Sequence, residues 1–210
     1  MLLLIAIIGS HLTAQNSYQE VMLKQVQDLE SANSKEDYIN LKNNFNRIGL
    51  VRQNWLTNYY EALCAIAWGN LEEDELMSER LFLEALQKMQ IARQLKGDAL
   101  ELDILKARLW QVQLVKDRRR FLEIGKKLFE LLDDITRKAP DNPRGLLLWC
   151  ETIYRSPFGA HEKDTIRSRL DKATSLLESE LAKADILPCW GYEEARGFQQ
   201  RFLAEMAQKK

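Results

Sequence analysis

Histidine is the side chain that most often serves as a general base or as a metal ligand, and this sequence has few of them. The chain of 210 residues contains two, His11 and His161. The pair His161-Glu162 begins like the helix of a zinc protease, but the second histidine of that pattern is replaced by Thr165. We therefore interpret His161 as a loop residue near the start of a helix.

The other patterns of catalytic residues are missing as well. A serine nucleophile would depend on His161, the nine glycines are scattered, and the three cysteines form no Cys-x-x-Cys pair. The alternative is a carboxylate-based or metal-dependent enzyme assembled across helices, which typically uses Glu-x-x-His, and the sequence has none. We predict no enzyme activity, no catalytic residue, no metal site and no cofactor.

The charged runs are typical of helix ends and solvated faces. The acidic run 72–75 favours a helix N-terminus, where the helix dipole stabilises negative charge, and Asp133-Asp134 is typical of a solvated face. Lys116 and the arginines at 118–120 could hold a phosphate or an acidic partner, but such runs are more often solvated turns. The formal net charge of -1 predicts no nucleic-acid partner.

The cysteines and the aromatic residues fit packing roles. Cys64 and Cys150 lie among apolar neighbours and are interpreted as small core residues, whereas Cys189 lies in an expected loop. An oxidising compartment would permit a Cys150–Cys189 disulfide, if the last hairpin folds back on the helix that holds Cys150. Most aromatic residues fall on apolar stripes, and stacking on sugars or peptides is the alternative.

The elements that must position these residues are helices. Apolar residues recur three and four positions apart almost throughout, no run alternates as a strand does, and Gly and Pro number only nine and four. The expected helices span residues 18–29, 34–49, 55–69, 74–95, 98–112, 121–138, 143–154, 163–184 and 192–206.

Local signals mark several helix ends. Ser34 to Asp37 is a capping-box start, Asp98 with Glu101 can cap another helix, and Gly49 and Gly69 are natural stops. Pro140 ends one helix and Pro143 suits the first turn of the next, where its missing N–H is unpaired in any case.

Similar helix lengths and short connections predict an all-α fold of stacked antiparallel hairpins with eight or nine helices. Paired helices give units of about 35–45 residues, which is the range of helical-hairpin repeats. A single large bundle is the competing architecture, but so many helices rarely share one bundle core.

Residues 1–14 are predicted to be a signal peptide. Residues 2–8 are apolar, and Thr13-Ala14-Gln15 offers a cleavage point near Ala14. The run is too short to span a bilayer, and a buried N-terminal helix or strand is the alternative. We therefore expect a periplasmic or secreted single domain, residues 15–210, without a membrane span in the mature chain.

The segment 139–144 resembles the junction between tetratricopeptide repeats, where a proline ends one hairpin and starts the next. Counting on from it, Leu146 falls at the first apolar anchor of the following helix. Trp149, Cys150 and Ile153 fall at the large, small and large positions that interlock paired helices.

A longer pattern resembles a family of exported tetratricopeptide-like proteins of unknown activity, common in Bacteroidetes-type bacteria. Its residues here are Pro143, Arg144, Pro157, Phe158, Gly159, Pro188, Trp190 and Gly191. The early segment 55–62 also matches, while 160–163 and 96–98 depart from the family pattern. The resemblance implies a right-handed superhelix, export and a binding role, and it supplies no catalytic residues.

A stack of hairpins presents a concave surface lined by the first helix of each pair. The repeat count places Arg144, Leu147, Glu151 and Tyr154 on that surface, where an extended peptide could lie. We therefore predict a non-enzymatic protein-binding or scaffold module whose partner is a protein or peptide. The alternative is a structural subunit of an envelope assembly, which an exposed apolar patch around Phe198 and Phe202 would support. The oligomeric state stays open.

Overall fold

The computed structural model describes residues 17–157 and 159–208, and within these ranges the chain forms helices and no strand. The predicted all-α fold is confirmed. After a first helix, described over residues 17–30, come α2 (Lys35–Val51), α3 (Trp55–Leu71), α4 (Glu75–Gln94), α5 (Ala99–Lys116), α6 (Lys126–Lys138), α7 (Pro143–Arg155), α8 (Lys163–Leu181) and α9 (Tyr192–Gln208).

Local capping explains why most of these helices begin where they do. Ser34 forms the predicted capping box, in which its hydroxyl accepts from the N–H of Asp37 at 3.2 Å. The carboxylates of Asp74 and Asp98 accept from the first N–H groups of α4 and α5. Asn142 accepts from the N–H of Gly145 at 3.0 Å and thereby starts α7. These polar residues mark helix starts because they satisfy otherwise unpaired backbone donors.

Two glycines that we predicted to end helices lie inside them. The helix α2 continues past Gly49 to Val51, and α3 continues past Gly69 to Leu71. A side chain at Gly69 would come within 2.6 Å of the Phe82 ring on α4. A side chain at Gly49 would come within 3.0 Å of the Thr57 hydroxyl on α3. Both glycines let neighbouring helices approach, so their role is in packing rather than in termination.

The expected sixth helix begins irregularly. A 3-10 turn at Arg118–Arg120 and a π turn at Phe121–Gly125 precede α6 at Lys126. Asp117 caps the 3-10 turn by accepting from the N–H and the guanidinium of Arg119. The arginines of the basic cluster thus form a turn between helices, which is the more common role that we predicted for such a run, and Lys116 is the last residue of α5.

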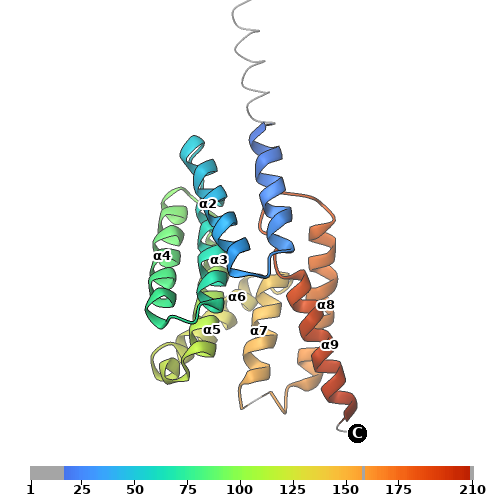
Figure 1. Ribbon diagram of the computed structural model, residues 1–210. Coiled ribbons are helices and arrows are strands. Elements are labelled where there is room, and N and C mark those ends of the chain that lie inside the picture. The colour runs from blue at the N-terminus through green and yellow to red at the C-terminus, as the bar shows by residue number, and fades with distance from the viewer. Residues whose placement is uncertain (1–16, 158, 209–210) are drawn as a thin grey trace, which may run out of the picture.

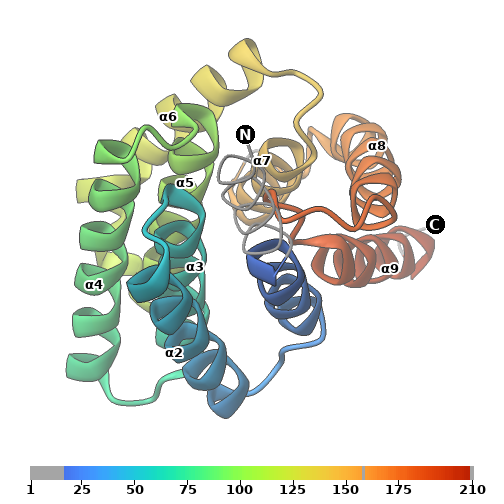
Figure 2. The same ribbon diagram turned by 90° about the horizontal axis from the view of Figure 1, so that it is seen from above.

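Consecutive helices pack as hairpins, and the hairpins stack into a curved array (Figure 1). The helices α3, α5 and α7 contact one another in sequence and form the inner layer of the curve, whereas α4 and α8 lie outside it (Figure 2). The arrangement is consistent with a helical repeat. The specific tetratricopeptide assignment stays a prediction.

The first helix and the segment before α9 lie on the inner side of this curve. The first helix lies between α2 and α9 (Figure 2) and buries Met22, Val26 and Leu29. The segment before α9 is tied to α3 by two tyrosines. Tyr60 donates to the carbonyl groups of Ile186 and Leu187, and the Tyr59 hydroxyl accepts from the Trp190 indole N–H at 2.6 Å.

The predicted Cys150–Cys189 disulfide is wrong, because all three cysteines are free. Cys189 lies beside Arg144 at the start of α7. Cys150 stands six residues further along that helix, which is about 9 Å of axial rise. Its thiol points at the carbonyl of Ile166 on α8, 3.6 Å away. The last segment folds onto the inner layer near the start of α7, so the two thiols do not meet.

Candidate ligand-binding cleft

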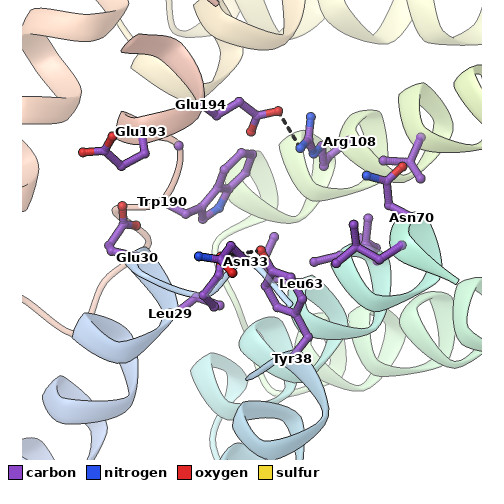
Figure 3. A pocket seen from close by; sticks show the side chains of 16 residues that line it. Leu29, Glu30, Asn33, Tyr38, Leu63, Asn70, Arg108, Trp190, Glu193 and Glu194 are labelled. Carbon is purple, nitrogen blue, oxygen red and sulfur yellow. Dashed lines mark hydrogen bonds and ion pairs between the residues drawn. The ribbon is translucent and has the colours of Figure 1, made fainter. Parts of the chain in front are cut away.

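One cleft opens on the inner side of the array, where residues 29–33 around the end of the first helix and residues 190–194 at the start of α9 meet α3 and α5 (Figure 3). Its enclosed space is about 220 Å³. That lies below the roughly 300–1,000 Å³ usual for drug-sized ligands, so the cleft suits only a small ligand. It is lined by Leu29, Glu30, Ala32, Asn33, Tyr38, Leu63, Ile66, Ala67, Asn70, Leu71, Arg108, Val112, Trp190, Gly191, Glu193 and Glu194.

The walls of the cleft are mostly apolar. Leu63 and Ile66 on α3 and Val112 on α5 are buried beneath it. Trp190 stands between these helices and the first helix, with 6% of its surface exposed. Its hydrogen bond to Tyr59 fixes the plane of the indole. A rigid aromatic side chain on an apolar wall is the common composition of a small-molecule site.

Tyr38 and the turn after the first helix close one side of the cleft. The Tyr38 hydroxyl donates to the carbonyl of Ala32 at 2.9 Å, which ties that turn to α2. Burial of the phenol raises its pKa. Tyr38 therefore acts as a neutral hydrogen-bond donor that holds the first helix in place.

An ion pair joins α5 to α9 at the back of the cleft. The Arg108 guanidinium lies 2.6 Å from the Glu194 carboxylate and 3.4 Å from that of Glu151 on α7 (Figure 3 shows the first contact). Glu151 is 4% exposed, and burial followed by the charge of Glu194 raises its pKa. The carboxylates of Glu151 and Glu194 thus share the Arg108 guanidinium, and its positive charge is neutralised by these two partners.

Glu30 lies at the mouth, at the end of the first helix. Burial, and next the charge of Glu193, raises its pKa to about 7. A carboxyl group whose pKa is higher in the folded chain than in the unfolded one stabilises the fold while it is protonated. This contribution is complete below the unfolded value near 4.5 and is lost as the pH rises through about 7.

We therefore expect the free energy of unfolding to fall between pH 5 and pH 8, with Glu30 contributing on the order of 1 kcal/mol after allowance for its partial exposure. The variant Glu30→Gln should flatten this slope, because glutamine does not titrate. Urea unfolding at pH 5 and at pH 8 measures this change in the free energy of unfolding. Glu20→Gln, at an exposed position on the same helix, serves as the control, and equal slopes in the two variants would contradict the assignment.

The four residues predicted to line a peptide groove lie in different surroundings. Arg144 is 4% exposed and is held by Glu101 at 2.7 Å and by Glu180 at 2.5 Å. Leu147 is fully buried against α8 and α9, and Glu151 pairs with Arg108.

Tyr154 lies apart from these three residues. Its ring packs against Phe198 and Phe202, and its hydroxyl donates to Glu205. A partner could reach Arg144, Leu147 and Glu151 only if the packing between α5, α7 and α8 opened. Binding of a partner by the four residues stays a prediction.

The residues of the family-like pattern fall at two places. Pro143 and Arg144 start α7, Pro188 is buried, and Trp190 and Gly191 line the cleft. Gly191 has φ +105°, a conformation that side-chain-bearing residues rarely adopt. Two others, Pro157 and Gly159, line a second cavity beside Tyr154, Phe202 and Met206. Phe158 lies outside the described residues, as does the predicted signal peptide.

Comparison with known proteins gives one informative result. No protein-family model and no curated protein matches the chain. The solved structure of the HusA haemophore from Porphyromonas gingivalis is similar, with a TM-score of 0.75 and 26% sequence identity. The match covers 89% of this chain and 92% of that one. This chain therefore resembles, almost from end to end, a helical protein from a Bacteroidetes organism, whereas the tetratricopeptide family assignment stays a prediction.

Proposed function

We propose that this chain is a non-enzymatic binding protein of the cell envelope that shields one small, largely apolar ligand in the cleft. The observation that carries the proposal is the apolar wall with Trp190, enclosed by segments from both ends of the chain. The similarity to a haemophore, which by its name is a carrier of a small molecule, supports the same class of function and an extracytoplasmic location. Among the described residues, no helix is long and apolar enough to cross a membrane.

The chemistry of the described residues favours binding over catalysis. Burial raises the pKa of the Cys150 thiol and of the Cys189 thiol to about 12, so neither is a ready nucleophile. Within the part of the chain that the structure describes, no three His, Cys, Asp or Glu side chains gather as a metal site. The charged groups at the back of the cleft pair with one another.

A small ligand suits the cleft better than an extended peptide does. The inner face that would receive a peptide is occupied by the first helix and by the segment that ends at Trp190. The structural-subunit alternative loses its expected support, because Phe198 and Phe202 are only 4% and 2% exposed. They pack against Tyr154 and form no exposed apolar patch.

Haem is the first ligand to consider, because the similar structure is that of a haemophore. The apolar wall and Trp190 form the kind of surface on which an aromatic ring packs. Proteins hold haem iron through His, Cys, Met or Tyr, and Tyr38 alone among the lining residues is of these types.

The rest of the haem molecule fits less well. The Tyr38 hydroxyl already donates to Ala32, and its raised pKa disfavours the phenolate that would bind iron. The haem carboxylates would also meet Glu30 and Glu193 at the mouth. The cleft thus fits an apolar ring but not the iron and carboxylates of haem, so our proposal is for an apolar ligand.

Filling the cleft tests the proposal. We expect the neutral fluorescent dye N-phenyl-1-naphthylamine to bind the native protein, and Ala67→Trp to weaken this binding about tenfold or more by occupying the site. Fluorescence titration measures the affinity. Ala182→Trp, at an exposed position after α8, adds the same side chain away from the cleft and should leave binding unchanged. Equal binding by both variants, with unchanged melting temperatures, would place the ligand elsewhere.

A further inference from the structure

We propose that the ligand of the cleft is an amphipathic cation, an apolar body that carries an ammonium or similar positive group. This inference rests on the proposed function and adds the ligand's chemical class. The apolar walls would take the body, and the acidic residues beside Trp190 would take the charge.

The positive charges nearest the cleft are held by internal partners. Arg108 contacts both Glu194 and Glu151. Arg144, which lies close enough to influence Glu30, is held by Glu101 and Glu180. Neither guanidinium is therefore free to receive an anionic ligand without breaking an ion pair that is buried at Arg144 and partly buried at Arg108, which is unfavourable.

The negative charges at the mouth are not neutralised in the same way. Glu193 is exposed and has a long contact of 3.8 Å with Arg196, which is also exposed. Such a surface pair contributes little free energy. Glu30 lies nearby at the end of the first helix, with its pKa raised by burial and by Glu193 and Glu194. Glu30 and Glu193 therefore leave the mouth with negative charge that no close cation neutralises, and a bound cation would relieve their repulsion.

The geometry places this charge next to an aromatic ring. In Figure 3, Glu30 and Glu193 lie on one side of Trp190, and Leu63 lies on the side of α3. Tryptophan is the side chain whose ring binds cations best, and the attraction grows where water is excluded. A ligand with its positive group between the glutamates and the indole could extend its apolar part along Leu63, Ile66 and Val112.

The test compares two ligands of equal length and opposite charge. Decylamine and decanoate, each below its micellar concentration, are titrated by calorimetry at pH 8, where an amine is cationic and a carboxylate anionic. We expect decylamine to bind about tenfold or more tightly than decanoate. The variants Glu30→Gln and Glu193→Gln should each lower the affinity for decylamine several-fold while lowering the affinity for decanoate less or not at all. Glu178→Gln, at an exposed position on α8, is the matched control and should change neither.

The outcomes separate this inference from the proposed function. Equal affinities for the two ligands, or tighter binding of decanoate, would overturn the cationic class while dye binding still supports the cleft. Absence of decylamine binding overturns the inference, and if the dye also fails to bind, the proposed function fails with it. A preference for decylamine that persists in both glutamine variants would show that Glu30 and Glu193 do not bind the positive group, and would contradict the inference.

Discussion

Replacing Arg144 by methionine is expected to lower the free energy of unfolding by about 3–5 kcal/mol, because the change leaves a buried carboxylate without its cation. The Arg144 side chain contacts Glu101 through Nε at 3.1 Å and through Nη2 at 2.7 Å, and Glu180 through Nη1. Glu101 itself is 8% exposed. Methionine preserves most of the apolar contact area of the arginine stem, so the measured loss reports chiefly on the charge. Urea unfolding followed by circular dichroism gives the value.

The control for this prediction is an arginine of the same fold without burial. Arg137→Met removes a pair with Asp134 on the surface of α6, where the arginine side chain is 77% exposed. Exposed pairs of this kind contribute about 0–1 kcal/mol. The double variant Arg144→Met with Glu101→Gln should recover part of the stability, because it no longer leaves a charged carboxylate at position 101. If Arg144→Met lost no more than Arg137→Met, the ion pair between α5, α7 and α8 would not be holding these helices together.

Replacing Trp190 by alanine is expected to have the second large effect, a loss of about 3–5 kcal/mol together with the loss of ligand binding. The indole fills the space between α3, α5 and the first helix, and it forms one wall of the cleft. Its removal takes away packing for both ends of the chain and leaves the Tyr59 hydroxyl without its donor. Chemical denaturation and dye titration measure the two effects on one protein sample.

Tyr59→Phe separates the hydrogen bond from the packing of Trp190. This variant removes the hydroxyl that accepts from the indole but keeps the apolar ring, so the expected loss is about 1–2 kcal/mol with the cleft retained. If Trp190→Ala bound the dye as tightly as the native protein, the indole would not be part of the binding site. A stability loss no larger than that of Tyr59→Phe would contradict its role in joining the chain ends.

Helix starts could be predicted from the sequence because capping is local. Ser34 and Asp98 each satisfy backbone donors two or three residues away, so the pattern and the structure involve the same few residues. The glycines show where this local reasoning fails. Gly69 can mark a stop or allow a close approach, and only the position of Phe82 on the next helix decides between them.

The cleft could not be predicted in the same way. Its residues are brought together by contacts such as Arg108 with Glu194 and Tyr59 with Trp190, which join distant parts of the chain. The repeat count placed Leu147 and Glu151 on a concave surface, whereas in the structure Leu147 packs against α8 and α9 and Glu151 pairs with Arg108. It carried no information that this face would be covered by the chain's own C-terminal part, which is why an open groove was expected there. Trp190 was singled out by resemblance, without its role.

Nuclear magnetic resonance can locate the bound ligand directly. Amide signals of the isotopically labelled protein would be followed during titration with the naphthylamine dye. We expect the largest shift changes at residues 29–33 and 63–71, at Arg108 and Val112, and at residues 190–194. Changes that gather instead around Tyr154, Phe202 and Met206 would place the site in the second cavity and contradict the central claim, as would a titration that leaves the cleft signals unmoved.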